Sequence, residues 1–144
     1  MSDRVFLDTN VLVYAFDEAE PAKKARAIEI LGTWEKGATP AISTQVLQEF
    51  YVSVVRKLKV PLSEEDAEAA VLRLCRLPVV QVDPAVVLGA IRTSRRLRLS
   101  FWDALVVQAA LEAGCKRLLT EDLQDGLLID GVLLVENPFV QRPR

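Results

Sequence analysis

Short apolar runs alternate with helical patterns along the chain, and this alternation constrains its fold more than any other feature. The runs have the length of strands and cover residues 5–7, 39–43, 79–82, 116–120 and 131–136. Strands that are separated by helices favour parallel pairing through right-handed crossovers. We therefore expect an α/β fold with three layers, α/β/α, around a central, mainly parallel sheet of about five strands.

Five longer segments carry helical periodicity or helix-capping residues, and they cover residues 22–36, 44–58, 63–76, 84–98 and 101–113. In the first segment, apolar side chains recur about every three residues. They are Ala25, Ile28, Leu31 and Trp34. Ser63, Asp83 and Ser100 are typical N-cap residues for three of the others. Because no linker or internal repeat interrupts the pattern, we expect residues 1–144 to form a single domain.

Composition excludes several kinds of chemistry. The chain has 144 residues, a net charge of −2, no histidine and two cysteines. Without histidine there is neither a Ser-His-Asp nucleophile nor an imidazole metal site. Two cysteines are too few for a thiolate zinc site, so we expect Cys75 and Cys115 to pack in the core as small apolar side chains. Catalysis must rest mainly on carboxylates, hydroxyls and cationic side chains.

The sequence offers no targeting signal. Its first residues lack the apolar run of a signal peptide, and no apolar stretch approaches the roughly 18 residues of a membrane span. We therefore expect a cytoplasmic protein that does not contact the membrane, in a reducing environment.

Four acidic residues stand where a parallel sheet collects functional groups. Asp8 directly follows the first strand and Asp122 closely follows the fourth, while Glu49 and Asp103 lie about one turn or less into helices. In such sheets, chemistry gathers outside the carboxyl ends of the strands. A converging carboxylate cluster without histidine suits a hard divalent cation such as Mg²⁺, which prefers oxygen ligands. The pattern predicts a metal site that activates water and orients a phosphate.

Each acid also has a purely structural interpretation. Asp8 is a good N-cap, and Asp103 matches a capping box with Ser100. Asp122 lies in a segment that is rich in turn residues. Glu49 falls opposite the apolar side of its helix, on a face expected to be solvated. That face also carries Gln45, Ser53 and Arg56.

Four short motifs resemble those of the PIN-domain ribonucleases, in the order of that family and across most of the chain. They are FLDTNVL at 6–12, STQVLQEFY at 43–51, LSFWDALVV at 99–107 and LTEDLQDG at 119–126. In each motif one acid corresponds to an acidic site residue of the family. These acids are Asp8, Glu49, Asp103 and Asp122. The chain's length is most similar to that of the VapC-type toxins of bacterial toxin–antitoxin pairs.

The resemblance implies a Mg²⁺- or Mn²⁺-dependent endoribonuclease, usually homodimeric, that a small antitoxin protein silences. It implies that Asp8, Asp103 and Asp122 hold the metal and that Glu49 completes the cluster or orients a water molecule. Side chains beside these acids are expected to orient them through hydrogen bonds. They are Thr9, Asn10 and Thr120. Asp125 is a further acid nearby, with no role assigned.

RNA requires positive charge outside the acidic pocket, and one arginine cluster is a candidate for it. Arg92, Arg95 and Arg96 share a helix face, and Arg98 follows them. The alternative is a solvated helix end, where cations are favoured by the helix dipole.

Other functional classes stay open at this point. A haloacid-dehalogenase-like phosphatase would need a second aspartate where Asn10 stands. A receiver-like phosphoacceptor would need paired acids near the first strand, and only Asp83, after the third strand, fits that class in part. The non-enzymatic alternative is a PIN-like RNA-binding protein without turnover.

Overall fold

A computed structural model describes residues 4–33 and 39–140. Its main sheet has four strands in the order β1-β4-β6-β5. They are β1 (Val5–Leu7), β4 (Arg117–Leu119), β6 (Leu133–Glu136) and β5 (Leu128–Ile129). The pairs β1–β4 and β4–β6 are parallel, and β5 is antiparallel to β6.

A second, two-stranded parallel sheet extends the first on the far side of β1. It consists of β2 (Ile42–Ser43) and β3 (Val79–Val80). Ala41, just before β2, exchanges backbone hydrogen bonds with β1: Leu7 N donates to Ala41 O at 3.0 Å, and Ala41 N donates to Val5 O at 2.8 Å. The expected sheet of about five strands is therefore a four-stranded sheet and a short pair joined through Ala41.

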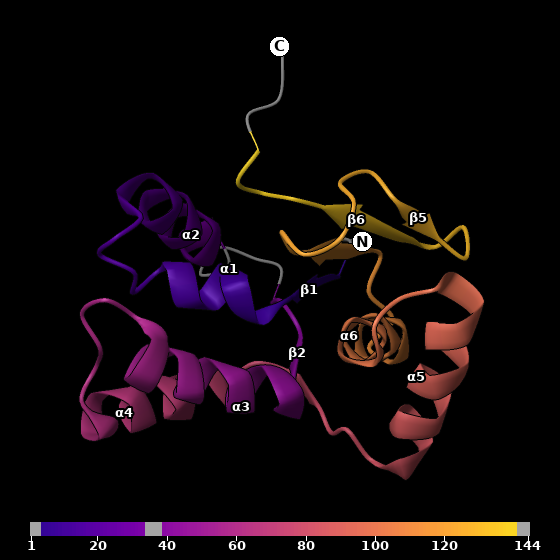
Figure 1. The fold of residues 1–144 in the computed structure, drawn as a ribbon, viewed down its shortest axis with the longest axis horizontal. Coiled ribbons are helices and arrows are strands. Elements are labelled where there is room, and N and C mark those ends of the chain that lie inside the picture. Colours follow the sequence, from indigo (N-terminus) through magenta and orange to yellow (C-terminus); the bar gives the residue numbers. More distant parts are fainter. Residues whose placement is uncertain (1–3, 34–38, 141–144) are drawn as a thin grey trace.

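Helices surround the strands in a three-layer α/β/α arrangement (Figure 1). The α-helices are α1 (Thr9–Tyr14), α2 (Pro21–Thr33), α3 (Thr44–Val52), α4 (Glu64–Leu74), α5 (Pro84–Leu97) and α6 (Phe101–Glu112). A π-helical turn, η2 (Ser53–Lys57), continues α3 directly. In Figure 1, α2 lies above α1, whereas α3 and α4 lie below α1. Helix α6 lies between the strands and α5.

The core lies between the strands and these helices. Phe6 and Leu118 from the sheet and Phe50 from α3 are fully buried within one continuous apolar cluster. Burial of such side chains stabilises a fold by about 1.5–3 kcal/mol each. This packing fixes α1 and α3 against the ends of β1 and β4, where the acidic residues lie.

Several expectations need correction. Cys115 is buried as predicted, but Cys75 is exposed, because it caps the C-terminus of α4 rather than facing the core. The helix expected at 22–36 is present from Pro21 to Thr33, and residues 34–36 lie outside the described part of the chain. Its buried side chains are Ala27 and Ile30, whereas Ile28 is half exposed.

Two elements were not predicted. Helix α1 begins immediately after β1, and β5 forms a hairpin with β6. Asp130, Gly131 and Val132 connect the paired residues Ile129 and Leu133. Asp130 and Gly131 have φ angles of 54° and 68°, and Val132 N donates to Ile129 O at 3.0 Å. Asp and Gly are favoured where a hairpin turn requires positive φ angles.

None of the helices in the described ranges combines the length and the apolar content of a membrane-spanning segment.

Candidate functional site

Asp8 is held rigidly at the carboxyl end of β1. It is the N-cap of α1, and its Oδ1 accepts a hydrogen bond from Thr9 N at 2.7 Å. Its Oδ2 accepts one from the hydroxyl of Thr120 at 2.8 Å. The side chain is buried. Both carboxylate oxygens therefore have a fixed donor on one side, and their remaining lone pairs are oriented in advance.

Thr120 and Asn10 tie the first acid to Asp122. The buried Thr120 hydroxyl, which donates to Asp8, also accepts a hydrogen bond from Asp122 N at 3.0 Å. The amide of Asn10 donates to Asp122 Oδ2 at 3.1 Å. Because Thr120 and Asp122 follow β4, which pairs with β1, the two acids reach the same sheet edge.

Glu49 and Asp103 approach this edge from two helices. The hydroxyl of Thr9 donates to Glu49 Oε1 at 2.7 Å, so α1 orients an acid of α3. Asp103 lies in the first turn of α6, where its backbone N–H donates to Ser100 Oγ at 3.1 Å. Its carboxylate makes no hydrogen bond within the described residues, and it lies close enough to act electrostatically on Asp122. Ser100 therefore provides the cap.

Burial and neighbouring charges make two of the carboxyls, Asp8 and Asp122, harder to ionise than ordinary ones. Burial is the main reason that the pKa of Asp8 rises from 3.8 to about 7; its hydrogen bonds oppose this rise, and the charges of Asp122 and Glu49 add to it. Partial burial also raises the pKa of Asp122, with further contributions from neighbouring acids that include Asp103 and Glu49, although Asn10 lowers it. Four acids that lie far apart in the sequence thus interact at one place.

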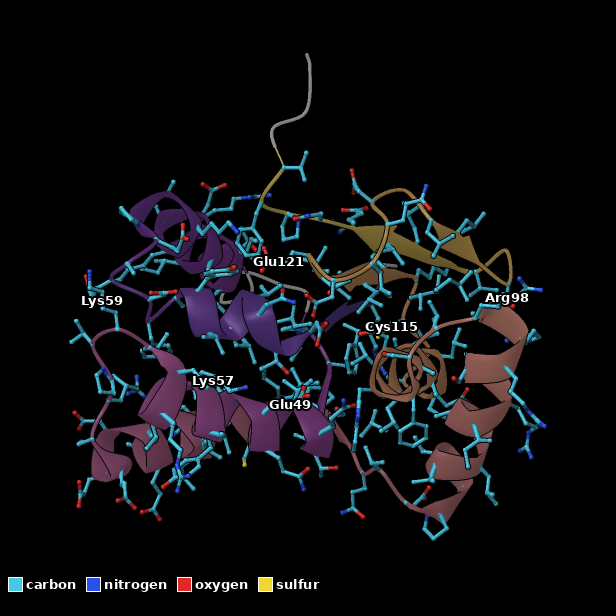
Figure 2. The ribbon with its side chains drawn as sticks, viewed as in Figure 1. Glu49, Lys57, Lys59, Arg98, Cys115 and Glu121 are labelled. Carbon is cyan, nitrogen blue, oxygen red and sulfur yellow. The ribbon has the colours of Figure 1, made fainter. Side chains whose placement is uncertain are left out.

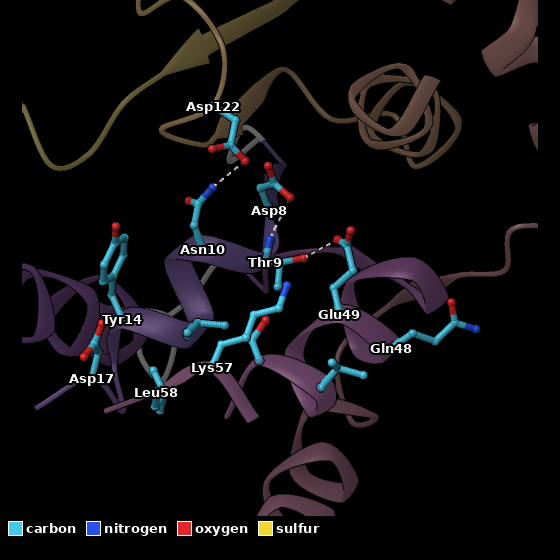
Figure 3. A pocket seen from close by; sticks show the side chains of 13 residues that line it. Asp8, Thr9, Asn10, Tyr14, Asp17, Gln48, Glu49, Lys57, Leu58 and Asp122 are labelled. Carbon is cyan, nitrogen blue, oxygen red and sulfur yellow. Dashed lines mark hydrogen bonds between the residues drawn. The ribbon is translucent and has the colours of Figure 1, made fainter. Parts of the chain in front are cut away.

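A pocket of about 580 Å³ opens beside Asp8 (Figure 3). Its lining includes three of the four acids, Asp8, Glu49 and Asp122, whereas Asp103 lies outside it. Among the described residues of its lining, Lys57 is the only one with a cationic side chain. Tyr14 and Asp17 line the other end.

The donor set fits a hydrated divalent cation. Within the described ranges, no group of three or more acidic or cysteine side chains is close enough to enclose a metal ion. Mg²⁺ does not require such a cage, since it retains several waters and is usually bound through one or two carboxylates together with substrate phosphates. The oriented oxygens of Asp8 and Asp122 are suitable ligands of this kind, and a cation would relieve the repulsion between them.

The four arginines singled out in the sequence lie away from this pocket. Arg92, Arg95 and Arg96 are exposed on α5, and Arg98 follows its last residue. In Figure 2, α6 lies between Arg98 and Glu49. The guanidinium of Arg96 pairs with Asp130 through two contacts, at 2.5 and 3.1 Å. A role of these residues in RNA binding stays a prediction.

The sequence interpretation missed several features. Lys57 enters the pocket, whereas Arg56 was expected on the Glu49 face. Gln45 is buried rather than solvated; its Nε2 donates to Trp102 O at 3.3 Å, and its Oε1 has no partner in the described chain. Asp125 has a structural contact, because its Oδ1 accepts from Asn137 N at 2.8 Å.

Comparison with known families gives the assignment. The PIN domain family matches residues 5–124, which is most of the chain. The chain belongs to the PIN domain family. All four acids lie within the matched residues. Asp83, the acid that partly suited a receiver domain, caps α5 by accepting from Val86 N at 2.9 Å and is absent from the pocket lining. Among curated proteins, no sequence matches this chain.

Solved structures share the PIN fold of this chain. A toxin–antitoxin complex from Klebsiella pneumoniae contains a chain with a TM-score of 0.69 and 19% identity, over 93% of this chain and 97% of that one. VapBC2 from Rickettsia felis, bound to a DNA fragment from its promoter, has a TM-score of 0.63 and 21% identity, over 93% of this chain and 98% of that one. VapC20 from Mycobacterium tuberculosis, described as a Sarcin-Ricin loop cleaving toxin, has a TM-score of 0.63 and 21% identity, over 79% of this chain and 86% of that one.

Proposed function

We propose that this PIN-domain protein is a metal-dependent endoribonuclease that hydrolyses RNA phosphodiester bonds. The observation that carries the proposal is the buried carboxylate of Asp8, held by two donors beside Asp122 and Glu49 and facing an open pocket. A carboxylate that is buried beside other acids lowers the stability of the fold, and such groups cluster at functional sites. A structural N-cap alone needs only the bond to Thr9.

Each residue of the candidate site has a proposed role in this reaction. Asp8, Asp103 and Asp122 would hold Mg²⁺ or Mn²⁺, directly or through water, and Glu49 would complete the acidic cluster or orient a water molecule. The chemistry that such an ion would supply is Lewis-acid activation of water and neutralisation of phosphate charge. Thr120 and the Thr9 backbone fix the orientation of Asp8, Asn10 fixes that of Asp122, and the Thr9 hydroxyl fixes that of Glu49. Such fixed orientation lowers the reorganisation needed during reaction.

We further propose that the chain is the toxin of a toxin–antitoxin pair, active as a cytoplasmic homodimer and silenced by a small antitoxin protein. The support is the fold shared with the Klebsiella pneumoniae complex and with VapC20 over most of their lengths. The motifs around the four acids, typical of VapC-type toxins, agree with this proposal.

A cleavage assay on purified, partner-free protein tests the nuclease. We expect single-stranded RNA to be cut with Mg²⁺ or Mn²⁺, and cutting to stop with EDTA and return when the metal is restored. Asp8→Asn should reduce the rate by orders of magnitude, whereas Asp83→Asn, at an N-cap outside the pocket, should cut like wild type. Full activity in EDTA, with metal-free protein confirmed by elemental analysis, would contradict metal dependence. RNA binding without any cleavage would favour the non-catalytic alternative.

A further inference from the structure

The acidic pocket contains one positive charge that the four-acid pattern does not explain. Lys57 lines the pocket together with Glu49 and Ser53, and Figure 3 shows its side chain extending toward Thr9 and Glu49. A pocket that receives a polyanion between carboxylates needs a cation on the substrate side. Lys57 lies where such a cation would act.

The π-helical turn η2 is what brings Lys57 to this position. An α-helix advances about 100° per residue, so position 56, seven residues after Glu49, returns to within about 20° of its direction, and position 57 overshoots by about 80°. A continuous α-helix would therefore present Arg56 to the pocket. In the structure, Leu58 N donates to Ser53 O at 3.3 Å, the five-residue spacing of a π-turn.

The π-turn takes up one more residue and so exchanges the two cations. Lys57 and Ser53 line the pocket, whereas Arg56 does not and lies near Tyr51 instead. The turn η2 is the last one of its helix, since Leu58 is already extended. Isolated π-turns are rare and occur frequently at functional sites. The consequence of this turn is that Lys57 rather than Arg56 faces the acids.

The Lys57 ammonium is free to bind a ligand. It forms no ion pair or hydrogen bond within the described residues, and its side chain is exposed. If its role were to neutralise the acids of the free protein, a direct contact with Glu49 or Asp8 would be expected. Glu49 instead accepts from Thr9, and Asp8 from Thr9 and Thr120.

We propose that Lys57 contacts a backbone phosphate of the RNA strand bound at the acidic site. The inference rests on the proposed nuclease function and adds a substrate-binding residue to it. A lysine binds phosphate as a point charge and carries no base information. Lys57 therefore contributes affinity equally to all RNA sequences, and neutralising it removes one phosphate contact.

The test compares Lys57→Gln with Arg56→Gln, the neighbouring cation outside the pocket, and with Lys57→Arg, which keeps the charge. Binding of random-sequence single-stranded RNA is measured with Ca²⁺ in place of Mg²⁺ across a series of KCl concentrations. For Lys57→Gln we expect affinity to fall about tenfold at low salt, and the slope of log affinity against log salt to become shallower by about 0.7. Arg56→Gln should keep the wild-type slope, and Lys57→Arg should largely restore it.

Two further measurements separate the possible outcomes. Poly(U) and poly(A) should lose affinity by the same factor in Lys57→Gln, and thermal melts should match wild type because the side chain is exposed. An unchanged salt slope in Lys57→Gln, or an equal loss in Arg56→Gln, would overturn the phosphate contact. Cleavage of the same RNA by wild type with Mg²⁺ is measured in parallel, so that failure of the nuclease proposal is recognised separately.

Discussion

At the residue scale, the central feature is a carboxylate that the fold makes difficult to ionise. Asp8 is buried, accepts two hydrogen bonds and faces the acids Glu49 and Asp122. Its pKa of about 7 in the folded chain lies above the ordinary value of 3.8. The folded state therefore holds a proton on Asp8, between about pH 4 and pH 7, that the unfolded chain has already released.

This difference predicts how metal-free stability depends on pH. Since the folded state binds more protons in that window, the free energy of unfolding should fall as pH rises from about 4 through about 7. Asp8→Asn cannot titrate, so its pH dependence should be flatter. At pH 8 in EDTA, the variant should be more stable than wild type by about 1–2 kcal/mol, after loss of one hydrogen bond is counted.

Urea unfolding in EDTA at several pH values measures the effect, with Asp83→Asn as control. Asp83 also caps a helix through its carboxylate but lies outside the pocket, so its variant should keep the wild-type pH slope. Added Mg²⁺ should stabilise wild type more than Asp8→Asn, because the proposed metal site includes the ionised Asp8 carboxylate and ligand binding to the native state raises its stability. Identical pH slopes for wild type and Asp8→Asn would contradict the raised pKa.

At the element scale, the sequence predicted regular features well and local departures poorly. The caps at Asp83 and Ser100 are present, because they need only the residue type and the next turn. Helix α1 was missed since its six residues are too few to show an apolar period. The hairpin was missed although its Asp130-Gly131 turn signal is in the sequence.

In the candidate site, too, the residues in regular sequence patterns were predicted and those that depend on local departures or distant contacts were not. The family motifs indicated the four acids and their hydrogen-bonding neighbours, because each lies within a few residues of a strand or helix end. Lys57 could not be predicted, since periodicity assumes an unbroken α-helix and η2 adds a residue to one turn. Burial of Gln45 depends on its contact with Trp102 of α6, 57 residues away, which no local pattern contains.

Helix α6 offers a test that separates capping from function. Ser100 Oγ accepts the first-turn N–H of Asp103, whereas the Asp103 carboxylate makes no hydrogen bond within the described residues. We expect Ser100→Ala to lower stability by about 1 kcal/mol and to retain metal-dependent cleavage. Asp103→Asn should be as stable as wild type, or about 1 kcal/mol more stable, without metal, yet lose activity by orders of magnitude.

Thermal melts with and without Mg²⁺, together with the cleavage assay, distinguish these two variants. The Mg²⁺-induced shift in Tm should shrink for Asp103→Asn and persist for Ser100→Ala. An active Asp103→Asn protein with an undiminished shift would exclude Asp103 from the site and leave capping as its role.

At the scale of the whole molecule, the parallel β1–β4 pairing explains how distant segments form one site. It places Asp8 and Asp122 at one sheet edge, and the packing of α1 against α3 brings Glu49 there. The same arrangement leaves large apolar side chains exposed among the described residues. Leu72, Leu88 and Trp102 are 71%, 54% and 64% exposed. These side chains belong to three different helices, α4, α5 and α6.

The proposed role as the toxin of a toxin–antitoxin pair predicts that a small protein encoded beside this gene binds the chain tightly. Co-expression with the adjacent reading frames, followed by pull-down on a tag of this chain, should recover a complex of fixed stoichiometry. That complex should lack the metal-dependent cleavage of the isolated chain, and removal of the partner by denaturation and refolding should restore it. Cleavage by the isolated chain without any binder from adjacent frames would contradict the toxin proposal and leave the nuclease proposal standing, because the four acids of the proposed site all come from this one chain.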